Sequence, residues 1–132
     1  MNKLYVSSNK RNEMIDITND ICKIVENEKI ENGLLIIYVP HTTAGVTINE
    51  GADPNVQYDI LQRLEKIVPK NGDYYHSEGN SDAHIKASII GSSVNVFIEN
   101  NSLILGTWQK IFLFEGDGPR KRTLYIKIIK DF

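Results

Sequence analysis

One apolar run constrains the fold of this 132-residue chain more than any other feature. Residues 34–39 read Leu-Leu-Ile-Ile-Tyr-Val, and Pro40 ends the run, which predicts a buried strand. The run is far too short for a membrane span, which needs roughly 20 apolar residues. Because the start of the chain is also too polar for a signal peptide, we expect a cytoplasmic protein with no membrane partner.

Further β-rich runs outnumber the helical patterns. Apolar residues at helical spacing over 17–25 predict one helix, with Asn32-Gly33 as its stop, and Asp53-Pro54 marks the start of a second that ends at Pro69. The other strand candidates are 4–8, a short stretch before Asp16, 43–49, 85–90, 94–98, 103–114 and 122–129. These patterns predict a single domain, residues 1–132, of the α+β class, with a mostly antiparallel sheet and two main helices.

Composition excludes several kinds of protein. Fifteen Lys and Arg stand against seventeen Asp and Glu, for a net charge of −2, so we expect no nucleic-acid partner. The single cysteine, Cys22, excludes an internal disulfide and any all-cysteine metal site. Cys22 lies between Ile21 and Ile24, which indicates a packing residue and not a nucleophile.

Three histidines are the main candidates for chemistry. We expect all of them outside the helices: His41 follows the buried strand, and His76 and His84 belong to a polar loop over 71–83 and its exit. The segments around them contain carboxylates but no Lys or Arg. Neutral imidazoles near carboxylates suit a divalent metal such as zinc, manganese or magnesium, so we predict all three histidines as ligands.

The spacing of the histidines is not a metal-binding signature, and solvated loops are the alternative. In the metal hypothesis, Glu50 or Asp82 lies behind the ligands or acts as general base.

Positive charge is concentrated late in the chain, at Arg120, Lys121, Arg122, Lys127 and Lys130. We predict Arg120, together with Lys86, as clamps on a phosphorylated substrate. The alternative is a solvated strand whose lysines protect a sheet edge.

Hydroxyl and aromatic residues would complete the site. The hydroxyls of Thr42, Thr43 and Ser88 are suitable donors to phosphate. Trp108 could stack on a flat ring, although core or interface packing is the commoner role of a lone tryptophan, and Gln109 adds a polar group beside it.

Several of these segments together resemble the YjbQ-like family, also called secondary thiamine-phosphate synthases. The matching residues are His41-Thr42-Thr43-Ala44, Asn49-Glu50, Asp53-Pro54, Tyr74-Tyr75-His76, Asp82-Ala83-His84-Ile85-Lys86-Ala87-Ser88, Gly91, Leu105-Gly106-Thr107-Trp108-Gln109, Glu115 and Arg120-Lys121-Arg122. Ser92 and Phe97 depart from the family, which often has prolines there, and we expect this to alter a strand edge more than the chemistry.

The resemblance implies an α+β fold around a large mixed sheet, assembled as a homotrimer. It also implies a weak or secondary thiamine-phosphate synthase activity, which joins hydroxymethylpyrimidine diphosphate to a thiazole phosphate and releases pyrophosphate. The alternative is a non-catalytic trimeric protein that binds a metal or a metabolite. Both hypotheses use the same pocket, so the sequence does not separate them.

Overall fold

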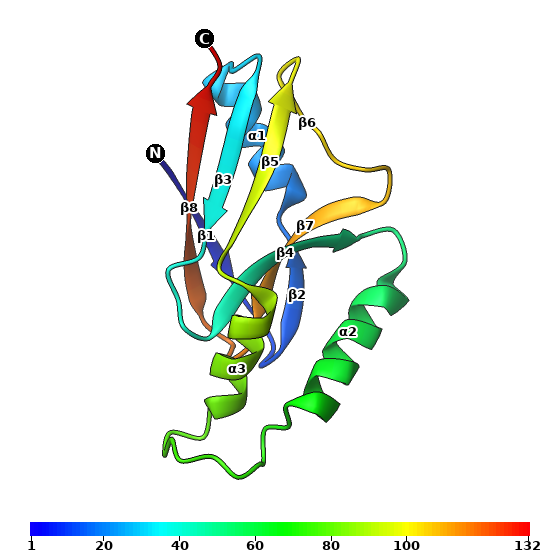
Figure 1. Cartoon of the computed structure of the whole chain (residues 1–132), viewed down its shortest axis with the longest axis vertical. Coiled ribbons are helices and arrows are strands. Elements are labelled where there is room, and N and C mark those ends of the chain that lie inside the picture. The colour runs from blue at the N-terminus through cyan, green and yellow to red at the C-terminus, as the bar shows by residue number, and fades with distance from the viewer.

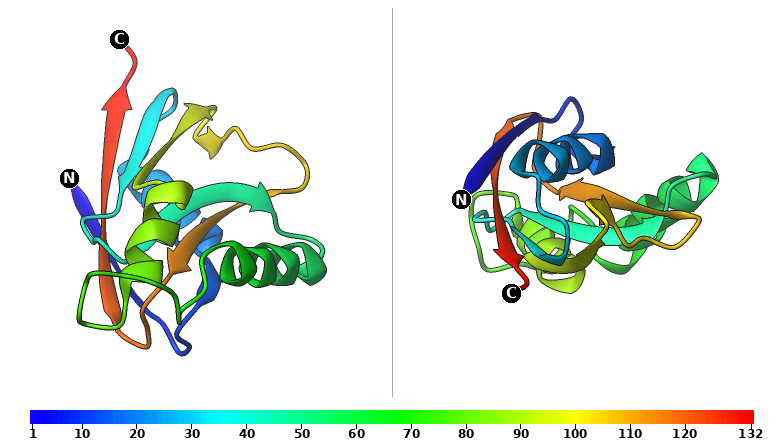
Figure 2. Two further views of the ribbon diagram at one scale, coloured as in Figure 1. Left: turned by 60° about the horizontal axis from the view of Figure 1, so that its bottom comes forward. Right: turned by 90° about the horizontal axis from the view of Figure 1, so that it is seen from above.

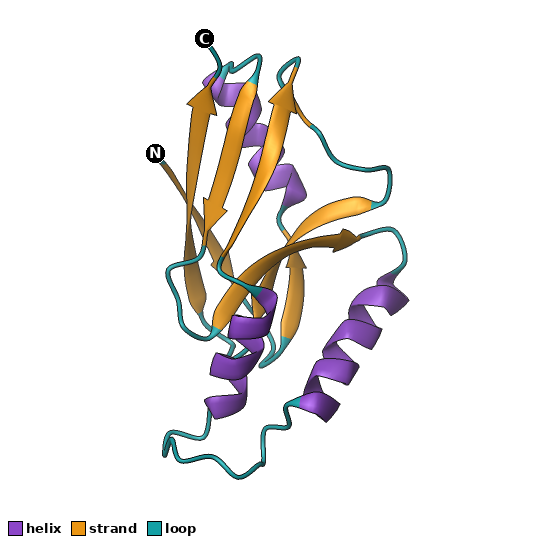
Figure 3. Ribbon diagram, in the orientation of Figure 1, coloured by secondary structure: helices purple, strands orange, loops and turns teal.

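A computed structural model describes all 132 residues, with three helices and eight strands (Figure 3). The helices are α1 (Thr18–Glu28), α2 (Pro54–Ile67) and α3 (Ser81–Ile90). The strands are β1 (Asn2–Ser7), β2 (Glu13–Asp16), β3 (Gly33–Tyr38), β4 (Ala44–Glu50), β5 (Ser93–Glu99), β6 (Ser102–Leu103), β7 (Gln109–Glu115) and β8 (Lys121–Lys130). None of the helices combines the length and the apolar character that crossing a bilayer requires.

The strands form two sheets (Figure 1). One has five strands in the order β1-β8-β3-β5-β6, and the other has three in the order β2-β7-β4. Every strand pair is antiparallel. The predicted α+β class with mostly antiparallel strands is therefore confirmed. The one large mixed sheet that the resemblance implied is not present, because no strand pair is parallel and the strands divide between two sheets. A third helix is also present.

The core lies where α1 and the two sheets face one another (Figure 2). The apolar run that predicted a buried strand is β3, and Leu35 and Ile37 are completely buried on its inner face. Ile21 of α1 and Ile126 of β8 are buried in the same cluster. Burial of each such side chain contributes about 1.5–3 kcal/mol. This core fixes the end of β3, where the loop that carries His41 begins.

Both predicted helix starts are confirmed, and each has a carboxylate at its N-terminus. Asp16 Oδ1 accepts from the Thr18 N–H and Asp53 Oδ1 from the Asn55 N–H, both at 2.9 Å. α2 packs sparsely on the rest of the chain and stands to one side of the sheets in Figure 1. Leu64 is its only buried residue, so most of its apolar side chains are left partly uncovered.

The predicted strand over residues 85–90 is wrong, because this segment belongs to α3. The buried side of α3 consists of small or ion-paired residues: Ala83 and Ala87 are buried, and Lys86 pairs with Asp82 one turn earlier at 2.8 Å. Ile85 and Ile89, the residues typical of a strand, are exposed instead. Apolar residues therefore lie on the outside of this helix, which is why their pattern misled the prediction.

The predicted strand over residues 103–114 is interrupted. Its first residue ends β6 in the five-stranded sheet, and its last part is β7 in the three-stranded sheet. Between them the chain turns at Gly106, whose carbonyl accepts from the Gln109 N–H at 3.0 Å. Asn100 and Asn101 form the turn between β5 and β6, and both residues have positive φ angles, 51° and 60°.

Candidate functional site

A hollow of about 510 Å³ lies where the loop after β3, the start of β4 and the side of α3 meet. We call it the histidine hollow, and its lining residues are His41, Thr42, Ala44, His84, Ala87, Ser88, Gly91 and Ser92. Its volume suits a small metabolite. None of the lining residues is Asp, Glu, Lys or Arg, so the hollow is lined by uncharged side chains and by histidines.

Two glycines allow β4 and the end of α3 to approach closely enough to form the hollow. The Val46 N–H donates to the Gly91 carbonyl at 3.0 Å. A Cβ atom at Gly45 would lie 2.6 Å from that same carbonyl oxygen, so a larger residue would push α3 away from β4. Gly91 itself ends the helix with a φ of 100°, which other residues rarely adopt.

The backbone around the hollow has hydrogen-bond donors without acceptors. The N–H groups of His41, Thr42, Thr43 and Ser92 donate to no atom of the chain. Thr43 is buried and His41 half-buried, whereas Thr42 and Ser92 are exposed, so water or a ligand can accept from their N–H groups. Together with the hydroxyls of Thr42 and Ser92, these donors suit a ligand that presents several oxygen atoms. Ser88 contributes less, because its hydroxyl already donates to the His84 carbonyl at 2.9 Å.

His41 makes one specific contact with the fold. Its Nε2 atom accepts a hydrogen bond from the Thr123 N–H of β8 at 3.0 Å. Burial and the nearby positive charge of Arg122 lower the pKa of His41. The ring is therefore neutral near pH 7, and its Nε2 lone pair is engaged by the protein.

His84 and His76 lie together, but not as the sequence suggests. The expectation that all three histidines lie outside the helices is wrong for His84, which is in α3. The rings of His76 and His84 meet edge to face, with centroids 5.3 Å apart. His76 Nε2 also lies 3.7 Å from a Glu78 carboxylate oxygen. No three His, Cys, Asp or Glu side chains of the chain are arranged to hold a metal ion.

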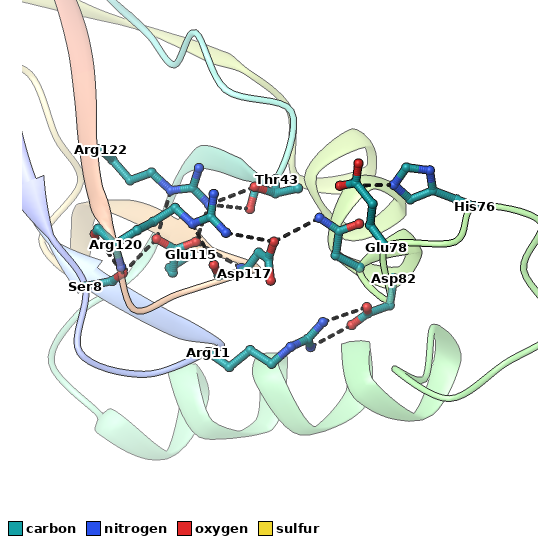
Figure 4. A network of polar contacts seen from close by, with 11 residues as sticks. Ser8, Arg11, Thr43, His76, Glu78, Asp82, Glu115, Asp117, Arg120 and Arg122 are labelled. Atoms are coloured by element: carbon teal, nitrogen blue, oxygen red, sulfur yellow. Dashed lines mark hydrogen bonds and ion pairs between the residues drawn. The ribbon is translucent and has the colours of Figure 1, made fainter.

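A buried ion pair lies directly behind the His41 loop (Figure 4). Arg122 pairs with Glu115, and its Nη2 atom donates to the Thr43 hydroxyl at 2.8 Å and to the Thr43 carbonyl at 3.2 Å. The Ser8 hydroxyl donates to Glu115 at 2.8 Å. Burial opposes ionisation of Glu115, but hydrogen bonds from Arg122, Asp117 and Ser8 keep its pKa below the usual value. The pair fixes the loop and places a positive charge behind the hollow.

Asp82 and Lys86, two predicted catalytic residues, form a second buried cluster. Arg11 donates two hydrogen bonds of 2.9 Å to Asp82, and Lys86 Nζ lies 2.8 Å from both Asp82 and Glu65. Burial opposes ionisation of Asp82, but these bonds prevail and lower its pKa to about 2. Such a carboxylate is a poor base. Lys86 is 1% exposed and absent from the lining of the hollow, so this arrangement does not present it to a ligand there.

The basic run near the C-terminus is not one surface. Arg122 points inward to Glu115, whereas Arg120 is half exposed. Arg120 pairs with Asp117 at 3.0 Å, and Asp117 accepts from the Asn80 amide at 2.9 Å, just before α3 (Figure 4). The predicted clamp at Arg120 thus tethers the β7–β8 turn to α3 and does not line the histidine hollow.

Glu50, Trp108 and Gln109 lie at the other end of β4. Glu50 pairs in register with Gln109, and the Gly51 N–H donates to the Trp108 carbonyl at 2.8 Å. At about 3.3 Å per residue, the length of β4 separates them from the hollow by about 20 Å. Glu50 accepts from the N–H groups of the turn before α2. Within one chain these three residues do not join the hollow, and their proposed roles in a site remain predictions.

The structure thus brings His41, Thr42, His84 and Ser88 to one hollow, with Thr43 in its loop and His76 against His84. Sequence reasoning did not identify the pairing of Glu115 with Arg122. The one available signal was a glutamate at the end of the apolar run 111–114. The Thr123 N–H carries no side-chain signal, so its contact with His41 had to come from the structure.

Fold and site together define a small α+β protein with a hollow lined by hydrogen-bond donors, and comparisons with known proteins show its family and fold. The chain belongs to the UPF0047 protein YjbQ-like family, whose model matches residues 2–131. It is 51% identical to a UPF0047 protein of Methanocaldococcus jannaschii, over 98% of this chain and 94% of that protein. It is 49% identical to the UPF0047 protein YugU of Bacillus subtilis, over 96% of each.

A crystal structure of a YjbQ/UPF0047 family protein from Clostridium acetobutylicum has the same fold. It superimposes with a TM-score of 0.96 at 50% sequence identity, and covers 98% of this chain and all of that chain. The names of these relatives state no reaction or ligand.

Proposed function

We propose that this protein is an enzyme that acts on a phosphorylated small molecule bound in the histidine hollow. One observation carries the proposal: the lining of the hollow offers unpaired N–H groups from His41, Thr42 and Ser92, and it contains no carboxylate. Phosphate oxygens accept several hydrogen bonds at once, so they match such a set of donors. A carboxylate in the lining would repel them.

The electrostatic environment supports the same ligand class. The guanidinium of Arg122 lies behind the loop and is held by the Thr43 hydroxyl and carbonyl. Glu115 partly balances the charge of Arg122. Burial is the main cause of the lowered pKa of His41, and the charge of Arg122 is the second. An anion in front of the loop would be stabilised by the same positive field.

Among reactions of phosphorylated molecules, the family resemblance favours thiamine-phosphate synthase. In this reaction the C–O bond to diphosphate breaks, and diphosphate leaves with the electron pair. The thiazole nitrogen then forms the new C–N bond, so neither an enzyme nucleophile nor a general base is needed. The hollow fits this requirement, because its donors can stabilise the leaving diphosphate and its lining provides no carboxylate base.

A bound divalent metal, whether zinc, manganese or magnesium, stays a prediction, but with two histidine ligands in place of three. His41 does not fit the ligand role, because its Nε2 lone pair is engaged by Thr123. His76 and His84, with ring centroids 5.3 Å apart, can each direct a nitrogen to one ion. We propose that a metal at this pair takes its remaining ligands from the phosphorylated substrate or from another copy of the chain.

We also propose that the chain assembles as a homotrimer. Supporting this, the outer face of the five-stranded sheet carries a row of apolar residues: Leu34 is paired in register with both Phe97 and Ile129, which are 69% and 48% exposed. Light scattering should give about 45 kDa, three times the chain mass of 15.0 kDa. A particle of one chain mass would contradict the homotrimer.

A cytoplasmic location and the absence of a nucleic-acid partner remain predictions of the sequence.

The second candidate is a non-catalytic protein that binds a phosphorylated metabolite. Apart from histidine, the hollow has no side chain that could act as a general base. This favours the binding protein, because most reactions of phosphate esters need a general base. Binding alone would still use the same donors.

The deciding experiment measures pyrophosphate release from hydroxymethylpyrimidine diphosphate and thiazole phosphate, with and without each metal. The enzyme proposal predicts turnover that His84→Ala reduces at least tenfold, about 1.4 kcal/mol, while the exposed Lys127→Ala does not. Diphosphate binding without turnover would favour the binding protein. If the protein neither binds diphosphate nor turns the substrates over, both proposals are contradicted.

A further inference from the structure

His41 lies at an unusual point of the five-stranded sheet. β3 pairs with β8 up to Tyr38, which lies opposite Tyr125, and this register, continued by two residues, would set Pro40 opposite Thr123. β3 has ended there, so no strand carbonyl accepts from the Thr123 N–H. The His41 ring takes that place, with Nε2 3.0 Å from the Thr123 nitrogen. The imidazole is therefore hydrogen-bonded to β8 just beyond the end of β3, where it continues the hydrogen-bond ladder of the sheet.

This contact determines which nitrogen of His41 carries the proton. A backbone N–H is always a donor, so Nε2 must supply its lone pair. In the neutral ring the proton is then on Nδ1. Because Nε2 is engaged and Nδ1 has no free lone pair, neutral His41 offers a single directed N–H and no site for a metal.

We propose that the Nδ1–H of His41 donates a hydrogen bond to an oxygen of a phosphate or diphosphate group in the histidine hollow, and that His41 is not a metal ligand. The inference rests on the proposed function and assigns the role of this residue within it. His41 lines the hollow, and the unpaired N–H groups of its own loop lie beside it. One phosphate group can accept from the ring and from this backbone together.

The fold also holds the loop in place on its opposite side. Arg122 donates to both oxygens of Thr43, and Glu115 holds Arg122. The donors of the loop are thus fixed before a ligand binds, at Thr123 on one side and at Arg122 on the other. A donor set that needs no rearrangement binds an oxyanion more tightly than a mobile one.

The test combines imidazole ¹⁵N NMR of the whole protein with titration by inorganic pyrophosphate. We expect the Nδ1–H tautomer of His41 in the free protein, and a shift of the Nδ1 proton when pyrophosphate is added. His41→Ala should weaken pyrophosphate binding at least about tenfold. Zinc binding, measured separately, should not change in that variant.

Two further variants separate the two nitrogens of the ring. His41→Gln places an amide oxygen near the position of Nε2, so it keeps the acceptor for Thr123 but loses the donor. His41→Asn places an amide nitrogen near the position of Nδ1, so it keeps the donor. We expect His41→Asn to retain more pyrophosphate affinity than His41→Gln.

The outcomes distinguish this inference from the proposed function. An Nε2–H tautomer, full pyrophosphate affinity in His41→Ala, or loss of zinc binding in that variant would overturn the donor role while the hollow could still bind phosphate. Failure of the wild-type protein to bind pyrophosphate, with the Nδ1–H tautomer present, would instead overturn the proposed function. Full folding of each variant is checked by its thermal unfolding midpoint.

Discussion

Two groups of polar residues flank α3, and they differ in whether their hydrogen bonds are satisfied. On the side facing α2, Asp82 and Lys86 are buried and bound to Arg11 and Glu65, with distances of 2.8 to 2.9 Å. On the side facing β4, the histidine hollow has donors without acceptors. The charged residues of the first group therefore hold the fold, whereas the neutral donors of the hollow have no partner in the chain.

The same contrast applies to the late basic run. The sequence analysis places Arg120 and Arg122 in one basic run, but Arg122 is buried with Glu115 and Arg120 is half exposed. Because Arg122 is buried and paired with Glu115, it does not contact a ligand directly. It can still act on the ligand through its field and through the loop that it fixes.

The largest effect is expected from Arg122→Met, which tests whether the ion pair behind the loop is structural. Glu115 would remain buried and charged without its main partner, so the free energy of unfolding should fall by about 3–5 kcal/mol. Urea denaturation at one protein concentration measures this. The matched control is Lys127→Met on the exposed face of β8, with a change within about 0.5 kcal/mol. Equal stabilities of the two variants would contradict the role assigned to the pair.

The second prediction concerns acid stability. Asp82 has a pKa of about 2 in the folded chain against 3.8 as the ordinary value, so its contribution is complete above pH 4 and disappears as the pH falls to 2. This difference corresponds to about 2 kcal/mol. Asp82→Asn should lower the free energy of unfolding at neutral pH, and its stability should depend less on pH in this range. If the free energies of unfolding of the wild type and Asp82→Asn change with pH in parallel, the low pKa assigned to Asp82 is ruled out.

A smaller effect is expected in the hollow from Ser92→Ala. Loss of one neutral donor costs about 0.5–1.5 kcal/mol, so pyrophosphate affinity should fall by about two- to tenfold while stability stays unchanged. Calorimetric titration measures the affinity. The control is Ser93→Ala, the neighbouring serine outside the lining of the hollow. An equal loss in both variants would mean that the site is not where we place it.

The smallest effect is expected from Arg120→Ala, which removes an exposed ion pair. Stability should fall by about 1 kcal/mol or less, and pyrophosphate affinity should not change. Titration of this variant beside Ser92→Ala compares the basic run with the hollow directly. A tenfold loss of pyrophosphate affinity in Arg120→Ala would indicate that the basic run, and not the hollow, binds phosphate.

Elements with strong local signals could be predicted from the sequence. The apolar run before Pro40 and the Asp53-Pro54 start gave β3 and α2 with nearly correct bounds. α3 could not be recognised from its apolar residues, since Ile85 and Ile89 are on its exposed side. The Asp82–Lys86 spacing of four residues was a helical signal, but it competed with a β-rich run.

The candidate site was predicted in part. His41, Thr42, His84 and Ser88 do line one hollow, because the end of a buried strand and a helix behind it bring them together. The burial of Lys86 and the inward direction of Arg122 depend on contacts with residues 21 and 7 positions away, in other elements. No local pattern distinguishes such a cation from one that awaits a phosphate. The unpaired backbone donors are likewise invisible in a sequence.

The most direct measurement of the central claim is a backbone amide NMR titration of the wild-type protein with inorganic pyrophosphate. If the hollow binds phosphate through its free donors, the amide signals of His41, Thr42, Thr43 and Ser92 should shift most, and saturate together. The largest shifts at Lys121, Lys127 and Lys130, or no shifts at any amide, would contradict the claim.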